Sequence, residues 1–265
     1  MAANGDNRTG AGPGDALIPH VPGTGISFVR FAPEAPYDER LIFWEQRDLE
    51  TAAAFRLLRQ RLIDRGDPRI VLCTSAEPGE GKTTLAANLA LAFAELGKHR
   101  VLLIEANFRS AALGEVFGFK PPAGFAAQLA RHRQDPGAPW IVVQIANSPL
   151  FIMAAEPRCC PKCAAVLGEE AKFCGMCGTE TVTTAGGSLD AVTFANAIKQ
   201  FRESFHYVVV DAPAVLSSGD VNLMQDSADA IVFATRKGRS AARRLRRAIE
   251  QVAPAPVAAV ALIDE

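Results

Sequence analysis

The chain has 265 residues, of which 49% are hydrophobic and 22% are charged, with a formal net charge of −1. This composition is typical of a globular protein, and its near-zero charge excludes a general attraction to nucleic acid or anionic lipid. No run of 18 apolar residues and no secretory leader pattern occurs, so we expect a cytoplasmic protein without a transmembrane segment.

The first segment, residues 1–36, is rich in Gly, Pro, Ala and Asn and has few apolar clusters. Such a segment buries too little surface to offset its chain entropy, which predicts a disordered tail. The main domain is expected to occupy residues 37–265. Within it, residues 48–63 have apolar side chains at helical spacing with arginines between them, and this pattern predicts an amphipathic helix.

Strands alternate with helices along the rest of the chain. The pattern predicts a strand at 69–73, a loop at 74–81, a helix at 82–96 and a second strand at 100–104. Together these elements are expected to form a β-α-β unit with parallel pairing. Further strands are expected at 140–145, 150–154, 207–210, 230–234 and 257–263, and helices at 189–205 and 240–252. This alternation predicts the α/β class, with a doubly wound, mainly parallel sheet.

The loop over residues 76–84 (AEPGEGKTT) resembles a Walker A phosphate loop between a strand and a helix. Gly79 and Gly81 let main-chain amides turn toward phosphate oxygens, while Lys82 would neutralise the β and γ phosphates and Thr83 would bind Mg²⁺. A chance glycine-rich turn is the alternative, which the flanking strand and helix disfavour. The expected nucleotide-binding residues are Gly79, Glu80, Gly81, Lys82, Thr83 and Thr84, with ATP and Mg²⁺ as cofactors.

A second acidic pattern supports the phosphate loop. The apolar run at 207–210 leads directly into Asp211, as in the Walker B motif. The carboxylate at the end of such a strand holds Mg²⁺ at the carboxyl edge of a parallel sheet. Thr83 and Asp211 are therefore the expected magnesium ligands.

Four cysteines form two C-x-x-C pairs separated by ten residues, within a segment, 157–187, that has no helical or strand periodicity. This spacing predicts an inserted zinc ribbon, in which four thiolates bind one structural Zn²⁺ in a closed tetrahedral site. The expected zinc ligands are Cys160, Cys163, Cys174 and Cys177. Two disulfides or an iron–sulfur cluster are the alternatives, and the absence of a secretory signal and the spacing favour zinc.

Three stretches together resemble a known family: FRLLRQRL at 55–62, the segment 74–109 and the segment 207–238. They are similar to the bacterial tyrosine kinases of capsule and exopolysaccharide biosynthesis and export, P-loop ATPases related to the partition and division-site ATPases. The likeness covers roughly residues 48–265 apart from the insert. It implies a P-loop NTPase fold of the Walker A, A′ and B type.

The resemblance also implies an activity and partners. It predicts an ATP-hydrolysing or tyrosine-protein kinase-like phosphotransferase in which Lys82, Glu105 and Asp211 are catalytic. Glu105 takes the first acidic place of Walker A′, as a base or water-positioning residue. The implied partners are a membrane polysaccharide-export activator, which would hold the protein peripherally at the inner membrane, a protein tyrosine substrate in trans, and further copies of the chain through self-association.

Several positions depart from the family pattern. Asn107 replaces the second acidic residue of Walker A′, Ala53 replaces the glutamate of the interface helix, and Tyr37 and Tyr207 are the only tyrosines. These departures favour reduced or partner-dependent catalysis, and they weaken the case for ring-like self-assembly. Two other functions stay open: a weakly catalytic, nucleotide-dependent interaction module that uses the zinc ribbon, and a partition or positioning ATPase that uses the basic helix at 240–252.

Overall fold

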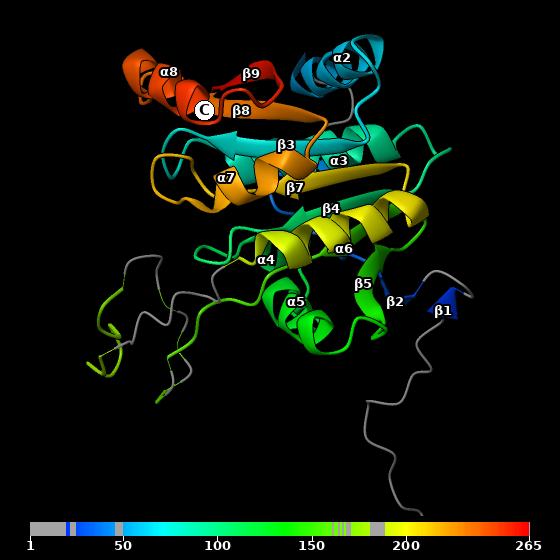
Figure 1. The fold of residues 1–265 in the computed structure, drawn as a ribbon, viewed down its shortest axis with the longest axis vertical. Helices are drawn as coiled ribbons and strands as arrows, with labels where there is room; N and C mark the ends of the chain where they lie inside the picture. The colour runs from blue at the N-terminus through cyan, green and yellow to red at the C-terminus, as the bar shows by residue number, and fades with distance from the viewer. Residues whose placement is uncertain are drawn as a thin grey trace, which may run out of the picture.

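A sheet of nine strands forms the centre of the described part of the chain, in the order β1-β2-β5-β6-β4-β7-β3-β8-β9 (Figure 1). The computed structural model describes residues 20–21, 25–45, 50–160, 162–163, 165, 167, 171–180 and 189–264. The strands are β1 (His20–Val21), β2 (Ile26–Phe31), β3 (Ile70–Ser75), β4 (Val101–Glu105), β5 (Trp140–Ile145), β6 (Leu150–Met153), β7 (Tyr207–Asp211), β8 (Ala230–Arg236) and β9 (Val257–Ile263). The helices are α1 (Ile42–Glu45), α2 (Glu50–Asp64), α3 (Lys82–Ala94), α4 (Leu113–Phe117), α5 (Phe125–Gln134), α6 (Ala191–Ser204), α7 (Asp220–Met224) and α8 (Ala242–Gln251), with a 3-10 turn, η1, at Gln225–Ser227.

The pairing of the strands confirms a mainly parallel, doubly wound α/β sheet. β6, β4, β7, β3, β8 and β9 pair in parallel, whereas β5 is antiparallel to β6 and parallel to β2. The expected direct pairing within residues 70–104 is wrong, because β7 lies between β3 and β4 and pairs with both. The sequence of β7, YVVVD, is apolar up to its last residue, so it can be buried on both faces in this central position.

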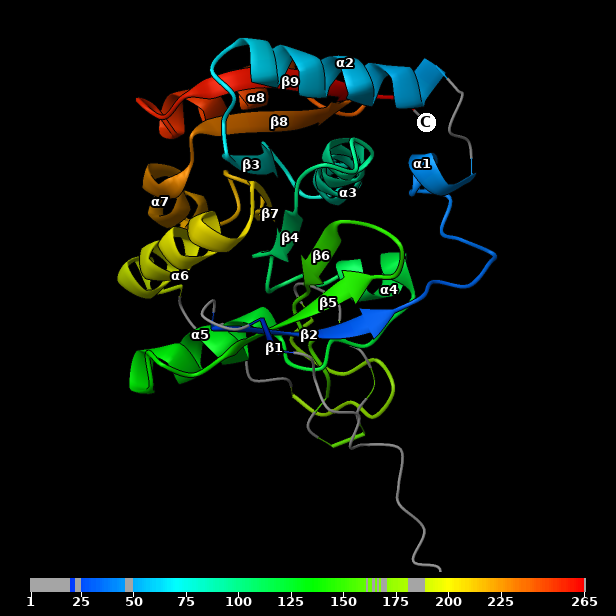
Figure 2. The same cartoon turned by 90° about the vertical axis from the view of Figure 1, so that its right-hand side faces the viewer.

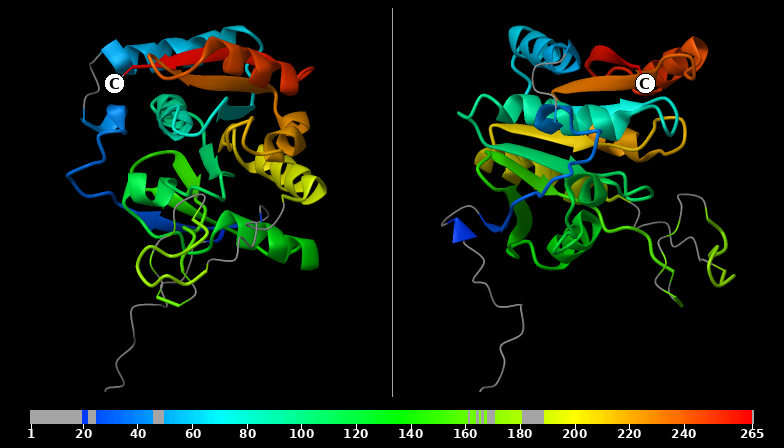
Figure 3. Two further views of the ribbon diagram at one scale, coloured as in Figure 1. Left: turned by 90° about the vertical axis from the view of Figure 1, so that its left-hand side faces the viewer. Right: turned by 180° about the vertical axis from the view of Figure 1, so that it is seen from behind.

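Helices cover both faces of the sheet and create two cores (Figure 2). Strand β3 contributes residues to both cores. Ile70 and Leu72 belong to the core beneath α5, α6, α7 and α8. Val71 and Cys73 belong to the core beneath α1, α2, α3 and α4. This alternation follows from the two-residue period of a strand. Figure 3 shows the same two layers from the other side and from behind.

Helix α3 is nearly apolar on every side. Eleven of its residues are buried because it lies between the sheet and α1 and α2. Its alanine-rich sequence lets these layers approach closely, and alanine has the highest helix propensity. The expected helix at 48–63 is confirmed as α2, and its first two residues, 48–49, lie within the stretch 46–49 outside the described part. None of the described helices is long and apolar enough to span a membrane.

Residues 26–31 differ from the expected tail. They form β2, whose residues pair in parallel with β5 from Ile26 opposite Trp140 to Phe31 opposite Ile145. Ile26 is buried, and the ring of Phe28 packs edge-on against Phe151. The averaged composition of residues 1–36 hid this short apolar run, so the tail boundary at residue 36 is wrong. Residues 1–19 and 22–24 lie outside the described part of the chain.

Candidate functional site

The phosphate loop connects the carboxyl end of β3 to the first turn of α3. Gly79 has a φ of 78° and Gly81 a φ of 87°, a left-handed conformation that residues with a β-carbon rarely adopt. Gly81 is the N-cap of α3 and no side chain caps this helix. The first-turn amides therefore carry the positive end of the helix dipole without a capping oxygen, which is the arrangement that binds an anion.

The side chain of Glu80 stabilises the loop from inside. Glu80 is buried, and its Oε2 accepts a hydrogen bond of 2.8 Å from the main-chain N–H of Glu77. Ser75 also stabilises the loop, because its hydroxyl donates a hydrogen bond of 2.7 Å to the carbonyl oxygen of Glu77. Glu80, which the sequence placed among the nucleotide-binding residues, thus uses its carboxylate to shape the loop.

Lys82, Thr83 and Asp211 lie together at the start of α3. The hydroxyl of Thr83 donates a hydrogen bond of 2.7 Å to Oδ2 of Asp211. Asp211 is fully buried, and its Oδ1 has no hydrogen-bond partner among the described residues. Burial raises the pKa of Asp211 to about 6, against the lowering effects of the Lys82 charge and the Thr83 hydrogen bond. This buried carboxylate oxygen needs a cation or a donor to offset its desolvation.

The register of the central strands explains why these groups meet. Cys73 of β3 lies opposite Asp211 of β7, and Asp211 lies opposite Glu105 of β4. Because the three strands are parallel, their carboxyl ends reach the same edge of the sheet, where the phosphate loop begins. The Lys82 side chain is only 7% exposed. A lysine so buried beside a carboxylate and a hydroxyl suits a phosphate and a divalent cation.

The carboxylate of Glu105 is directed at main-chain amides. Its Oε1 accepts hydrogen bonds from the N–H groups of Ala112 at 2.5 Å and Leu113 at 2.9 Å, and its Oε2 accepts one from Ala155 at 2.9 Å. Burial and the neighbouring Asp211 raise the pKa of Glu105 to about 7. These contacts join the start of α4 to the segment after β6. They are the contacts of a structural anchor and do not support the role of a base.

Asn107 lies on the same edge and keeps one acceptor available. It is buried, its Nδ2 donates to the carbonyl oxygen of Ser110 at 3.3 Å, and its Oδ1 has no hydrogen-bond partner among the described residues. An amide oxygen can bind a water molecule or a hard cation, although it cannot remove a proton. The sequence treated Asn107 only as a lost charge, because the direction of its oxygen depends on the fold.

The basic helix α8 contributes a contact that the sequence did not indicate. Arg244 of α8 forms an ion pair with Glu77 of the phosphate loop. The two residues are 167 positions apart in the chain, so local patterns carry no signal of this contact. The start of α8 therefore lies beside the loop, and part of its positive charge lies at the carboxyl edge of the sheet.

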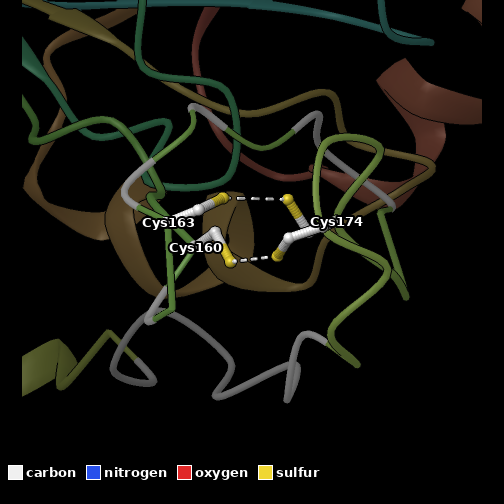
Figure 4. Close-up of side chains that lie close together, drawn as sticks. Cys160, Cys163 and Cys174 are labelled. Atoms are coloured by element: carbon white, nitrogen blue, oxygen red, sulfur yellow. Dashed lines mark hydrogen bonds between the residues drawn. The ribbon is translucent and has the colours of Figure 1, made fainter.

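The four expected zinc ligands come together in the insert. Figure 4 shows the side chains of Cys160, Cys163 and Cys174 turned toward a common centre. The Sγ atoms of Cys160 and Cys177 are 3.6 Å apart, those of Cys163 and Cys174 are 3.5 Å apart, and all four sulfurs lie within 4.8 Å of one another. Four thiolates at 2.3 Å from a tetrahedral Zn²⁺ would be about 3.8 Å apart. The cluster therefore fits such an ion closely.

The backbone around the cluster has the form of two turns that each present a pair of thiols. The N–H of Cys160 donates to the carbonyl of Ala165, and that of Cys174 donates to the carbonyl of Thr179, both at 2.8 Å. Gly178 has a φ of 69° and completes the second turn. Cys159 points elsewhere, since its Sγ donates to the carbonyl of Pro157, and Cys73 lies buried in β3.

Several known proteins are similar to this chain in sequence. No protein-family model matches the chain. It is 28% identical over 191 residues to the tyrosine-protein kinase YwqD of Bacillus subtilis, covering 72% of this chain and 69% of YwqD. It is 26% identical over 197 residues to the succinoglycan biosynthesis transport protein ExoP of Rhizobium meliloti, covering 74% of this chain. The chain spans only 22% of the length of ExoP.

A solved structure is similar to this chain in fold. The kinase domain of the Escherichia coli tyrosine kinase ETK superposes with a TM-score of 0.62 at 16% sequence identity, covering 85% of this chain and 80% of that domain. The chain shares the α/β fold of that domain. The resemblance to the bacterial tyrosine kinases of exopolysaccharide biosynthesis is thus confirmed in sequence and in architecture.

Replacing Glu105 with alanine should destabilise the protein. Three buried amides, those of Ala112, Leu113 and Ala155, would lose their acceptor, and we expect a loss of roughly 2–4 kcal/mol in the free energy of unfolding at pH 7.5. Urea denaturation followed by circular dichroism measures this change. Glu250→Ala, on the exposed face of α8, is the matched control and should change the midpoint little. Equal stability of the two variants would contradict the anchoring role.

Replacing Asp211 with asparagine should alter the dependence of stability on pH. The folded protein keeps a proton on Asp211 up to about pH 6, whereas the unfolded chain releases it near the ordinary pKa of 3.8. Protonation therefore favours the folded state at low pH, and this advantage disappears as the pH rises through that interval. Between pH 4 and pH 6, wild-type stability should fall relative to Asp211→Asn by up to about 3 kcal/mol.

Urea midpoints at half-unit pH intervals test this, without added nucleotide or magnesium. Asp226→Asn changes an exposed aspartate of η1 and should leave the pH profile of the wild type intact. Parallel profiles for wild type and Asp211→Asn would show that Asp211 does not titrate in this interval.

Proposed function

We propose that this chain binds Mg-ATP at its phosphate loop and acts as a phosphotransferase of the bacterial tyrosine-kinase type in exopolysaccharide biosynthesis. The observation that carries the proposal is the buried Asp211 oxygen without a partner, beside Lys82 and Thr83 at the uncapped start of α3. The sequence relationship to YwqD, which is named a tyrosine-protein kinase, supports the reaction class.

Each group of the site has a role in this proposal. The main-chain amides of residues 79–84 would hold the phosphates, and Lys82 would offset their negative charge. The hydroxyl of Thr83 and the carboxylate of Asp211 would hold Mg²⁺, which when bound offsets charge on the transferred phosphoryl group. The amide oxygen of Asn107 would accept a hydrogen bond from a water molecule of the magnesium shell.

Catalysis by the isolated chain is expected to be slow. Both carboxylate oxygens of Glu105 are engaged by main-chain amides, and Asn107 is neutral. Neither Glu105 nor Asn107 is then available to accept a proton from the substrate hydroxyl. We therefore propose that turnover depends on a membrane activator protein that presents the chain at the inner face of the membrane, and that the phosphoacceptor tyrosine belongs to another protein.

A second function is favoured by the same contacts. Glu105 links the carboxyl edge of the sheet to Ala155, five residues before the first zinc ligand, Cys160. A nucleotide-dependent interaction module with little turnover would use such a link between its nucleotide site and its zinc-binding insert, 157–187. Both functions require nucleotide binding, and they differ in phosphoryl transfer.

An assay with radiolabelled ATP separates the two functions. The purified full-length chain would be incubated with Mg-ATP alone, with the cytoplasmic part of a candidate membrane activator, and with that part plus a tyrosine-containing acceptor polypeptide. Phosphotyrosine that disappears in Lys82→Met and persists in Lys98→Met, a change at an exposed lysine, supports the kinase. Binding of ATP without any phosphoryl transfer supports the interaction module, and absence of binding contradicts both.

The insert is proposed to bind one structural zinc ion. Metal analysis of the purified protein should give about one Zn²⁺ per chain, because four thiolates close the coordination sphere. Cys174→Ser should lower the zinc content several-fold, since it removes a buried ligand. Cys159→Ser is the matched control, because Cys159 lies outside the cluster, and it should retain the metal. Iron in place of zinc, or a mass that shows two disulfides, would contradict this prediction.

A further inference from the structure

The segment after β8 lies against the phosphate loop. A β-carbon added at Gly79 would lie 3.4 Å from Nη2, 3.6 Å from Cζ and 3.6 Å from Nη1 of Arg239. Three guanidinium atoms at nearly equal distances from this position mean that the flat face of the group is turned toward the side of Gly79 where a β-carbon would project. Arg239 therefore places a positive charge beside the turn that is expected to curl around the phosphates.

A tight turn fixes the main chain at Arg239. The N–H groups of Arg239 and Ser240 both donate to the carbonyl of Arg236, at 3.2 and 3.0 Å, and the hydroxyl of Ser240 accepts from the N–H of Arg236 at 2.8 Å. Gly238 has a φ of 73°, which a residue without a β-carbon adopts at low cost. The turn is thus held by its own hydrogen bonds, and Arg239 is exposed on it.

The acidic groups of the loop are already engaged by other partners. Glu77 forms its ion pair with Arg244, and Glu80 accepts from the N–H of Glu77. Among the described residues, no carboxylate forms an ion pair with Arg239. Lys82 and one Mg²⁺ offset only part of the negative charge of a triphosphate. A second cation at the loop can therefore bind the remaining phosphate charge.

We propose that Arg239 is a phosphate-binding residue supplied by the β8–α8 turn, whose guanidinium swings from its place beside Gly79 onto the phosphate chain of the bound nucleotide. This inference rests on the proposed nucleotide site and adds a second cation to it. Arginine suits the task because its planar group donates two parallel hydrogen bonds to neighbouring phosphate oxygens. Nucleotide binding would then fix the position of the Arg239 side chain on this turn.

The test measures the dissociation constants of Mg-ADP and Mg-ATP by isothermal titration calorimetry on the full-length, zinc-loaded chain. Arg239→Ala should weaken both nucleotides about tenfold, as expected for the loss of one charge-assisted hydrogen bond. Arg239→Lys should recover part of the affinity, because it keeps the charge without the bidentate geometry. Arg243→Ala, an exposed arginine of α8, is the control and should bind like the wild type.

The outcomes separate the two claims. If wild type binds nucleotide and Arg239→Ala binds equally well, the role of Arg239 is wrong while the nucleotide site stands. If Arg243→Ala weakens binding as much as Arg239→Ala, the effect is a general one of surface charge and the specific role is also wrong. If wild type binds no nucleotide, the proposed function fails together with this inference. Thermal unfolding of each variant verifies that the exposed substitutions leave the fold intact.

Discussion

The buried carboxylate of Asp211 is the constraint on which the nucleotide end of this protein depends. A fully buried charge is costly unless a cation or donors surround it, and here one oxygen receives the Thr83 hydroxyl while the other has no partner among the described residues. The sheet order places β7 between β3 and β4, so Asp211 ends beside both the phosphate loop and Glu105.

Glu105 and Asp211 lie opposite each other yet have different surroundings. Three main-chain amides satisfy Glu105, which makes it part of the framework that joins α4 and the stem of the cysteine insert to the sheet. Asp211 keeps an oxygen available for a ligand. The side chain of Glu105 reaches past the strand end to the amides of Ala112 and Ala155.

Local sequence patterns predicted those parts of the site that lie next to one another in the chain. The strand, loop and helix around Lys82, the apolar strand that ends in Asp211 and the spacing of the four cysteines are all of this kind. Three features depended on distant contacts and were missed: the pairing of β2 with β5, the insertion of β7 between β3 and β4, and the contacts of Arg239 and Arg244 with the phosphate loop. Composition and periodicity do not show which distant segments pack together, so the main-chain contacts of Glu105 and the ion pair of Arg244 could not be predicted from the sequence.

The central claim is that the amides between Gly79 and Thr84 enclose a phosphate chain, with Lys82, Asp211 and a magnesium ion balancing its charge. A crystal structure of the full-length chain grown with Mg-ADP tests this most directly. The account predicts the β-phosphate within hydrogen-bond distance of those amides and a metal ion bound by Thr83 and near Asp211. A nucleotide bound elsewhere on the chain, or a phosphate loop without ligand at millimolar Mg-ADP, would contradict it.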